Sequence, residues 1–206
     1  MLKREEFYLR WSQLHGNTEI KGAVASWLNI SYRIGLICTL LRITPNILTL
    51  LGLLSAIAMA LTPHSLWAIA LLVFSLFFDG IDGSVAIFQH RESNWGAILD
   101  SVSDRISEAL WLYVLYRAGV PAWVAIAIWT IASTQEYARA RLASLGHHDI
   151  EVITPTERPV RAIFIFIALV AERLGLPGVN IFSYLFVALH LFGFYQVMRA
   201  SYKVLK

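Results

Sequence analysis

The sequence predicts an all-α integral membrane protein: a bundle of six transmembrane helices preceded by an N-terminal amphipathic helix at the membrane interface. Apolar residues make up 57% of the 206 residues, charged residues only 15%, and the mean hydropathy is +0.60. Such a chain is too apolar for an ordinary water-soluble domain. No strand-like alternation of apolar and polar residues is present, and lipid accepts only helices or closed barrels as spanning structures.

Six apolar runs define the expected spans. A chain of this length has room for about six helices of roughly 20 residues with short connections. The breaks between the runs contain proline or glycine, as in Thr62-Pro63 and Gly175 to Gly178. We therefore expect a single bundle domain over residues 44–206, with spans at residues 45–61, 65–88, 96–117, 121–143, 159–174 and 178–201.

Residues 1–43 form a separate juxtamembrane segment. They mix aromatic with basic residues, a pattern typical of helices that lie on an anionic membrane surface. The alternative is that residues 23–41 form a seventh span, which would place Arg33 deep in the membrane. The residues of this pattern are Phe7, Tyr8, Trp11 and Trp27 with Lys3, Arg4, Arg10, Lys21 and Arg33.

The distribution of basic residues predicts the orientation. With six spans, most lysines and arginines fall on one side, leaving chiefly Arg117 and Arg173 on the other. Both termini and the loop at residues 89–95 should then be cytoplasmic. The net charge of +3 is explained by this topology and by anionic lipid. We see no nucleic-acid-binding module, so nucleic acid is not expected as a partner.

Four aspartates in this apolar context are the main functional signal. Carboxylates in such surroundings must be paired, protonated or bound to metal. Residues three or four apart share one face of a helix, so two adjacent helices could each offer two acids to one point. The alternative for any one acid is an ion pair, for example with Arg105. The four acids are Asp79, Asp82, Asp100 and Asp104.

The segment around these acids resembles a known family. Its residues are Asp79-Gly80-Ile81-Asp82-Gly83-Ser84-Val85-Ala86-Ile87, followed by Gly96, Asp100 and Asp104. This resembles the signature D-x2-D-G-x2-A-R-x8-G-x3-D-x3-D of the CDP-alcohol phosphotransferase (phosphatidyltransferase) family at seven of its eight fixed positions. Thr44-Pro45-Asn46 is similar to the family's T-P-N segment before the first span.

The resemblance implies a reaction and a cofactor. The family moves a phosphatidyl group from CDP-diacylglycerol to an alcohol with release of CMP, in phospholipid biosynthesis. Hard divalent ions with oxygen ligands, Mg²⁺ or Mn²⁺, would neutralise the charge on the leaving phosphate, and we expect two of them. By resemblance, Asp79, Asp82 and Asp100 are the core metal ligands. Asp104 is the candidate general base and also lies near the second metal.

Donor binding is expected from Asp82, Gly83, Ala86, Arg91 and Gly96. The small residues would let the nucleotide approach the backbone closely. The one signature position that does not match holds Ile87, where the family usually has an arginine, so the contact to the donor diphosphate must come from elsewhere. A charge-assisted contact of this kind contributes about 1.5–3 kcal/mol. Substitutes are Arg91, one turn further along, and Arg139 or Arg141 from the fourth span; a catalytically inactive relative is the alternative.

Acceptor binding is expected from Arg139, Arg158 and Arg161. The motif E-R-P-x-R at residues 157–161 is similar to the corresponding stretch of actinobacterial phosphatidylinositol phosphate synthases, and arginine forks suit phosphate groups. Inositol phosphate and glycerol 3-phosphate are therefore the leading acceptors. Phosphatidylglycerol, which would make the protein a cardiolipin synthase, is an alternative, and so is a role for these arginines in contacting lipid headgroups.

A cation transporter is the alternative from another functional class. It would distribute acids through the membrane depth, whereas here they cluster at one end. The family resemblance also implies a homodimer and a location in a prokaryotic plasma (inner) membrane, with the active site cytoplasmic. Glu108 and Glu136 are expected near the site or as internal polar contacts, and His147-His148-Asp149 as a solvated loop.

Overall fold

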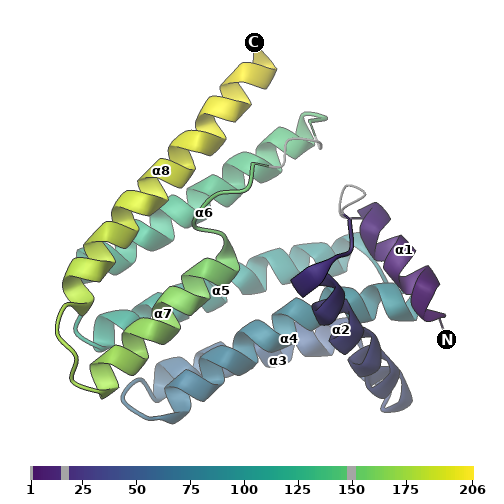
Figure 1. The fold of residues 1–206 in the computed structure, drawn as a ribbon, viewed down its shortest axis with the longest axis horizontal. Coiled ribbons are helices and arrows are strands. Elements are labelled where there is room, and N and C mark those ends of the chain that lie inside the picture. Colours follow the sequence, from purple (N-terminus) through teal and green to yellow (C-terminus); the bar gives the residue numbers. More distant parts are fainter. Residues whose placement is uncertain (1, 15–18, 148–151) are drawn as a thin grey trace. The chain divides into compact units, whose positions relative to one another are not determined.

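All secondary structure that the computed structural model describes is helical (Figure 1). The description covers residues 2–14, 19–147 and 152–206, so His148 and Asp149 lie outside it. The helices are α1 Arg4–Leu14, α2 Gly22–Leu40, α3 Pro45–Leu61, α4 Trp67–Gln89, α5 Asn94–Arg117, α6 Ala122–Ser144, α7 Arg158–Arg173 and α8 Val179–Leu205.

The helices α3 to α8 coincide with the six expected apolar runs. By length and apolar composition, however, only α4 and α8 qualify as membrane spans within the described residues. A third is added if α2 and α3, which meet at an angle of 107°, count as one broken span. Helices α3 and α7 are short, with 17 and 16 residues, and α5 carries acids. The all-helical membrane fold is thus supported, and the count of six spans is not confirmed.

The N-terminal segment contains two helices, α1 and α2, where one amphipathic helix was predicted. Helix α2 ends in a left-handed turn at Arg42, with φ of 59°. The amide of Ile43 donates to the carbonyl of Cys38 across this turn, at 2.8 Å, so the last carbonyls of α2 are satisfied. The chain then enters α3 at Pro45, which suits the first turn of a helix because its missing N–H has no partner there.

Two compact units make up the chain: residues 1–55 with 73–107, and residues 56–72 with 108–206. In the first unit, α1 and α2 pack against the end of α4. Phe7 is completely buried there, and its ring lies 6.3 Å from that of Phe88 and 5.8 Å from that of Tyr32, measured between centroids. Edge contacts of this kind suit aromatic quadrupoles. This cluster fixes α1 to the helix that carries two of the aspartates.

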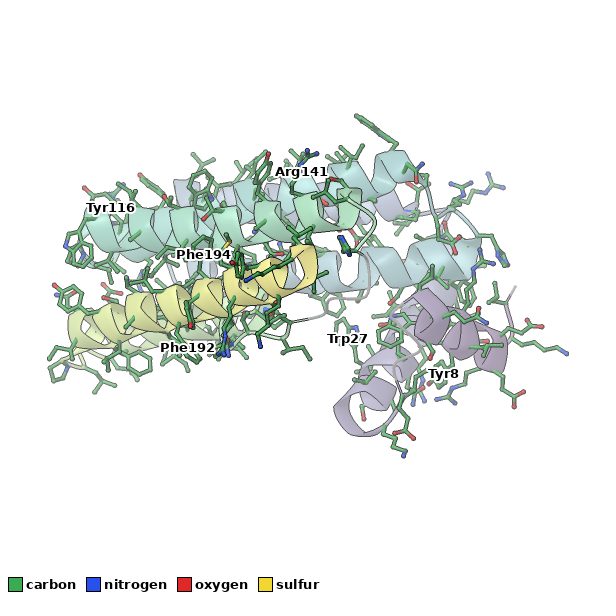
Figure 2. The ribbon with its side chains drawn as sticks, turned by 90° about the horizontal axis from the view of Figure 1, so that it is seen from above. Tyr8, Trp27, Tyr116, Arg141, Phe192 and Phe194 are labelled. Carbon is green, nitrogen blue, oxygen red and sulfur yellow. The ribbon has the colours of Figure 1, made fainter. Side chains whose placement is uncertain are left out.

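In the second unit, α6 runs along α8 (Figure 1). At Gly193 of α8, an added Cβ would lie 3.4 Å from the side-chain oxygen of Gln135 on α6 and 2.9 Å from the hydroxyl oxygen of Thr156, in the segment before α7. The ring of Phe164 on α7 stacks on Phe186 of α8 at a centroid distance of 3.9 Å. Other apolar side chains of α8 face outward, such as Phe192, which is 53% exposed (Figure 2). An outward apolar face is what a lipid-facing helix requires.

Candidate functional site

Three of the four predicted aspartates converge. Asp79 on α4 and Asp100 and Asp104 on α5 each present a carboxylate oxygen, and these oxygens lie within 4.8 Å of one another. All three side chains are half-buried. Like charges this close repel strongly unless a cation or a proton compensates them. Oxygen ligands of this kind suit hard divalent ions such as Mg²⁺ and Mn²⁺, so the residues fit the expected metal.

A tight reversal between α4 and α5 brings these acids together. Helix α4 ends at Gln89 and is followed by His90, whose φ of +54° is left-handed, and the amide of Arg91 donates back to the carbonyl of Ala86 at 2.9 Å. Helix α5 begins after Ser93, whose hydroxyl oxygen accepts the amide of Gly96 at 3.0 Å. This is the standard N-terminal cap of a helix. Backbone groups at the end of α4 and at the start of α5 are therefore hydrogen-bonded within a very short loop.

Asp82 lies in the same pocket but outside the converging group. It is 5% exposed. One carboxylate oxygen accepts the hydroxyl of Thr49 at 2.5 Å and the other accepts the amide of Gly83 at 2.6 Å. A carboxylate has about four acceptor positions, so Asp82 keeps capacity for a metal. The sequence did not reveal Thr49; its only signal is its place one turn after Pro45 at the start of α3.

Asp104 also lies near Arg105, the residue that the sequence suggested as a possible ion-pair partner. The Arg105 guanidinium is 3.8 Å from a carboxylate oxygen of Asp104. At this distance the two groups interact without a direct hydrogen bond. Asp104 therefore faces both the other acids and a neighbouring positive charge.

A cavity of about 470 Å³ adjoins the acids and is built entirely from the first unit. An added Cβ at Gly83 would meet no described atom within 4 Å, so the backbone there is open to a ligand. At Gly96 the same atom would lie 3.1 Å from the Ser93 hydroxyl oxygen. All five residues predicted to bind the donor line this cavity: Asp82, Gly83, Ala86, Arg91 and Gly96.

Ile87, at the position of the family's arginine, belongs to an apolar wall. It is 4% exposed and packs in one cluster with Phe7, Leu28 and Phe88. It also borders the cavity, which Arg91 lines from the loop. Arg91, one of the substitutes considered for the missing guanidinium, is thus present at this cavity.

The three arginines predicted to bind the acceptor lie in the second unit, and each already has a partner. Arg139 donates to both carboxylate oxygens of Glu157, at 2.7 and 3.1 Å, and to the carbonyl of Val152 at 2.6 Å. Burial raises the pKa of the Glu157 carboxyl, but hydrogen bonds from Arg139 and from Thr154 outweigh it. The pKa is lowered from 4.5 to about 2.

Arg161 and Arg158 are also engaged. The Arg161 guanidinium is 2% exposed, forms an ion pair with Glu108, and donates to the carbonyl of Thr156. Arg158 lies over the ring of Trp111, 5.1 Å from its centroid. Among the described residues, Arg139 forms ion pairs with Glu136 and Glu157, and Arg161 with Glu108 and, at 3.8 Å, with Glu136. Two of the three arginines of the predicted basic pocket are therefore already ion-paired with glutamates.

Comparison with known proteins agrees with the site. The family model for CDP-alcohol phosphatidyltransferase matches residues 42–195. An archaetidylinositol phosphate synthase from Pyrococcus horikoshii is 33% identical over 159 residues, 74% of this chain and 84% of that protein. A phosphatidylinositol phosphate synthase from Cutibacterium acnes is 30% identical over 176 residues, 78% of this chain and 81% of that protein.

The fold agrees as well. A crystal structure of the Mycobacterium tuberculosis phosphatidylinositol phosphate synthase with CDP-DAG bound superposes with a TM-score of 0.71 at 21% identity, over 84% of this chain and 94% of that one. A second structure of that enzyme, in complex with manganese and citrate, gives 0.70. Because the family model covers most of the sequence and the two relatives are 30% and 33% identical over more than two thirds of this chain, the chain belongs to the CDP-alcohol phosphatidyltransferase family of transferases.

Proposed function

We propose that this protein transfers a phosphatidyl group from CDP-diacylglycerol to an alcohol and releases CMP. The observation that carries this proposal is the convergence of Asp79, Asp100 and Asp104 beside a cavity open to the backbone at Gly83. The acids gather in the halves of α4 and α5 that adjoin the loop between these helices and are not spread along their full length, which supports an enzyme over a cation pathway.

The residues supply the chemistry as follows. Asp79, Asp82 and Asp100 would hold divalent ions, Mg²⁺ or Mn²⁺, and we propose two of them. When bound, the ions neutralise charge on the pyrophosphate and on the leaving CMP. The acceptor oxygen attacks the phosphorus next to the diacylglycerol, the P–O bond to CMP breaks, and CMP keeps the electron pair. Asp104 takes the proton of the acceptor hydroxyl.

We propose inositol phosphate as the acceptor. The names of the archaeal and bacterial relatives share the inositol phosphate headgroup and differ in the lipid, so they support the acceptor more strongly than the donor. Arg139, Arg158 and Arg161 would bind its phosphate. Because Arg139 and Arg161 are ion-paired with Glu157 and Glu108, a phosphate that binds either of these two arginines would compete with a glutamate.

We propose the membrane location, the orientation and the oligomeric state from the sequence pattern and the family. Six spans, α3 to α8, would cross a prokaryotic plasma membrane with both termini and the active site cytoplasmic. The apolar outer face of α8 and the basic residues near its C-terminal end support this orientation. A homodimer is proposed on the same family basis.

The test is a transfer assay in detergent. Purified protein receives labelled CDP-diacylglycerol and Mg²⁺ or Mn²⁺, with inositol phosphate, glycerol 3-phosphate or phosphatidylglycerol in turn, and CMP and lipid products are followed. Inositol phosphate should give product. Product only with another acceptor would correct the acceptor, and no CMP with any acceptor would overturn the function.

Asp100→Asn tests the metal site in the same assay. We expect at least about a 100-fold loss of turnover, because each tenfold corresponds to about 1.4 kcal/mol and a lost carboxylate ligand should cost more than two such steps. Glu172→Gln, which alters an acid outside the site paired with Arg173, serves as the control and should keep full activity. Full activity of Asp100→Asn would contradict the assignment.

A further inference from the structure

Helix α1 borders the candidate site although it lies outside the region that the family model matches. That region begins at residue 42, whereas α1 spans Arg4–Leu14. Trp11 and Leu14 of this helix nevertheless line the same cavity as Asp79 and Asp100. The wall that they form therefore belongs to this chain's own N-terminal segment and not to the family signature.

Two contacts hold α1 in this place. Phe7 is buried completely against α2 and the end of α4. Arg10 donates from Nε to a carboxylate oxygen of Glu92 at 2.7 Å and lies 3.3 Å from Nδ1 of His90, both in the loop between α4 and α5. Phe7, Trp11 and Leu14 are spaced by four and three residues, so they share one face of the helix. The face that anchors α1 is thus also the face that reaches the cavity.

A second tryptophan lines the cavity from α2. Trp27 packs against Gly80, where an added Cβ would lie 2.9 Å from its ring, and its ring meets that of Phe77 edge to face at 6.4 Å (Figure 2 shows Trp27 on α2). Gly80 is therefore needed for the approach of Trp27 to the turn of α4 between Asp79 and Asp82. The cavity combines carboxylates for a metal-bound phosphate with aromatic side chains, two kinds of group that suit a nucleotide.

We infer that α1 forms one wall of the nucleotide subsite and that Trp11 contacts the cytosine base of the CDP group. The inference rests on the proposed function. Arg91, Glu92 and Ser93 line the same cavity, and α1 is tied to that loop through Arg10. This polar surrounding suits the nucleotide and not the acyl chains of the donor. Contact with the base would also compensate for the donor contact that is lost because Ile87 stands where the family usually has an arginine.

The test compares the binding of CMP, which has no lipid, with that of CDP-diacylglycerol, in the presence of Mn²⁺. The variants are Trp11→Ala, Trp11→Leu, which keeps apolar bulk without a π face, and Trp11→Phe, which keeps a ring. Leu9→Ala is the matched control, since Leu9 is on the same helix, 62% exposed and outside the cavity lining. Thermal unfolding of each variant verifies that the fold is intact.

Loss of the base contact should weaken CMP binding by about tenfold in Trp11→Ala and Trp11→Leu. Trp11→Phe should recover most of the affinity, and Leu9→Ala should equal the wild type. In the transfer assay, the KM for the donor should rise by a similar factor with little change in kcat.

Three results would overturn the inference. Unchanged CMP affinity in folded Trp11→Ala and Trp11→Leu would exclude the base contact. Weakening confined to CDP-diacylglycerol would assign Trp11 to the lipid part of the donor. Absence of CMP and CDP-diacylglycerol binding in the wild-type protein would overturn the proposed function as well, which separates that failure from the first two.

Discussion

Glu157 shows how a single residue can organise the segment before α7. Its carboxylate accepts two hydrogen bonds from Arg139 and two from Thr154, one from the amide and one from the hydroxyl. Charge-assisted hydrogen bonds are stronger than neutral ones because the ionised acceptor attracts the donors. The ionised form of Glu157 is therefore part of what holds residues 152–157 against α6.

The stability of this segment should depend on acid pH. Because folding lowers the Glu157 pKa from 4.5 to about 2, its contribution is fully present above pH 4.5 and is lost as the pH falls toward 2. Thermal unfolding midpoints measured across this window should fall with pH in the wild type. Glu157→Gln should lower the midpoint at neutral pH and flatten the acid decline, whereas Glu5→Gln, an exposed acid on α1, should leave the decline in place. An unchanged decline in Glu157→Gln would refute the role.

Ile87 gives a second prediction at this scale. Restoring the family's arginine by Ile87→Arg should destabilise the protein by more than about 2 kcal/mol, because the new charge would enter the cluster of Phe7, Leu28 and Phe88. Ile87→Val, which removes only one methylene, should cost about 1 kcal/mol. The measurement is thermal unfolding in detergent with donor binding in parallel. An arginine variant that is as stable as the wild type and binds the donor more tightly would show that the cavity accepts the charge.

At the scale of elements, a buried ion pair between Arg161 and Glu108 joins the first turn of α7 to α5. Arg161 and Glu108 are both about 2% exposed by side chain, and removal of either one takes away the close ionic partner of a buried charge; Arg161 would keep only the more distant Glu136, at 3.8 Å. Removing one partner of such a pair is costly, whereas replacing both by apolar residues is often tolerated. The pair therefore positions the start of α7 and with it the neighbouring Arg158.

A double replacement separates the structural and the substrate-binding roles of Arg161. Glu108→Ala should destabilise the protein by about 3–5 kcal/mol, and Glu108→Leu combined with Arg161→Met should destabilise it much less. Glu172→Ala, which breaks the more exposed pair with Arg173 within α7, should cost less than about 1 kcal/mol. If the double variant is stable but its KM for the acceptor rises, Arg161 also binds the acceptor. An unchanged KM would restrict Arg161 to a structural role.

Helix α1 shows that an element outside the family region can still shape the site. Its place depends on the burial of Phe7 and on the contact between Arg10 and Glu92, which join residues far apart in the sequence. Sequence patterns identify amphipathic helices but not the surface on which they dock. The mixed aromatic and basic pattern therefore predicts Trp11 and Trp27 at the membrane interface, whereas both line the cavity beside the acids.

At the scale of the whole molecule, a ligand that binds only the folded state should stabilise all of it. With Mn²⁺ at 100 times its dissociation constant, the gain would be about 2.7 kcal/mol. The unfolding midpoint should therefore rise with Mn²⁺ and return with EDTA, and Asp100→Asn should lose this response while Glu172→Gln keeps it. A full response in Asp100→Asn would place the stabilising ion elsewhere.

The sequence alone determined the helical class, most ends of α3 to α8 within about two residues, the family, and the four aspartates. These features are local: apolar runs, proline and glycine breaks, and a motif confined to two adjacent helices with a short loop. The number of spans was not determined in this way, because acids and arginines lower the hydropathy of α5 and α6.

Only the tertiary structure decided how these residues are paired. It showed that Thr49 holds Asp82, that Arg161 is paired with Glu108, and that α1 walls the cavity. Each of these is a contact between residues distant in the sequence, and its partner is chosen by packing geometry and the cost of leaving a buried charge or polar group unsatisfied. No periodicity or motif in one chain encodes that choice.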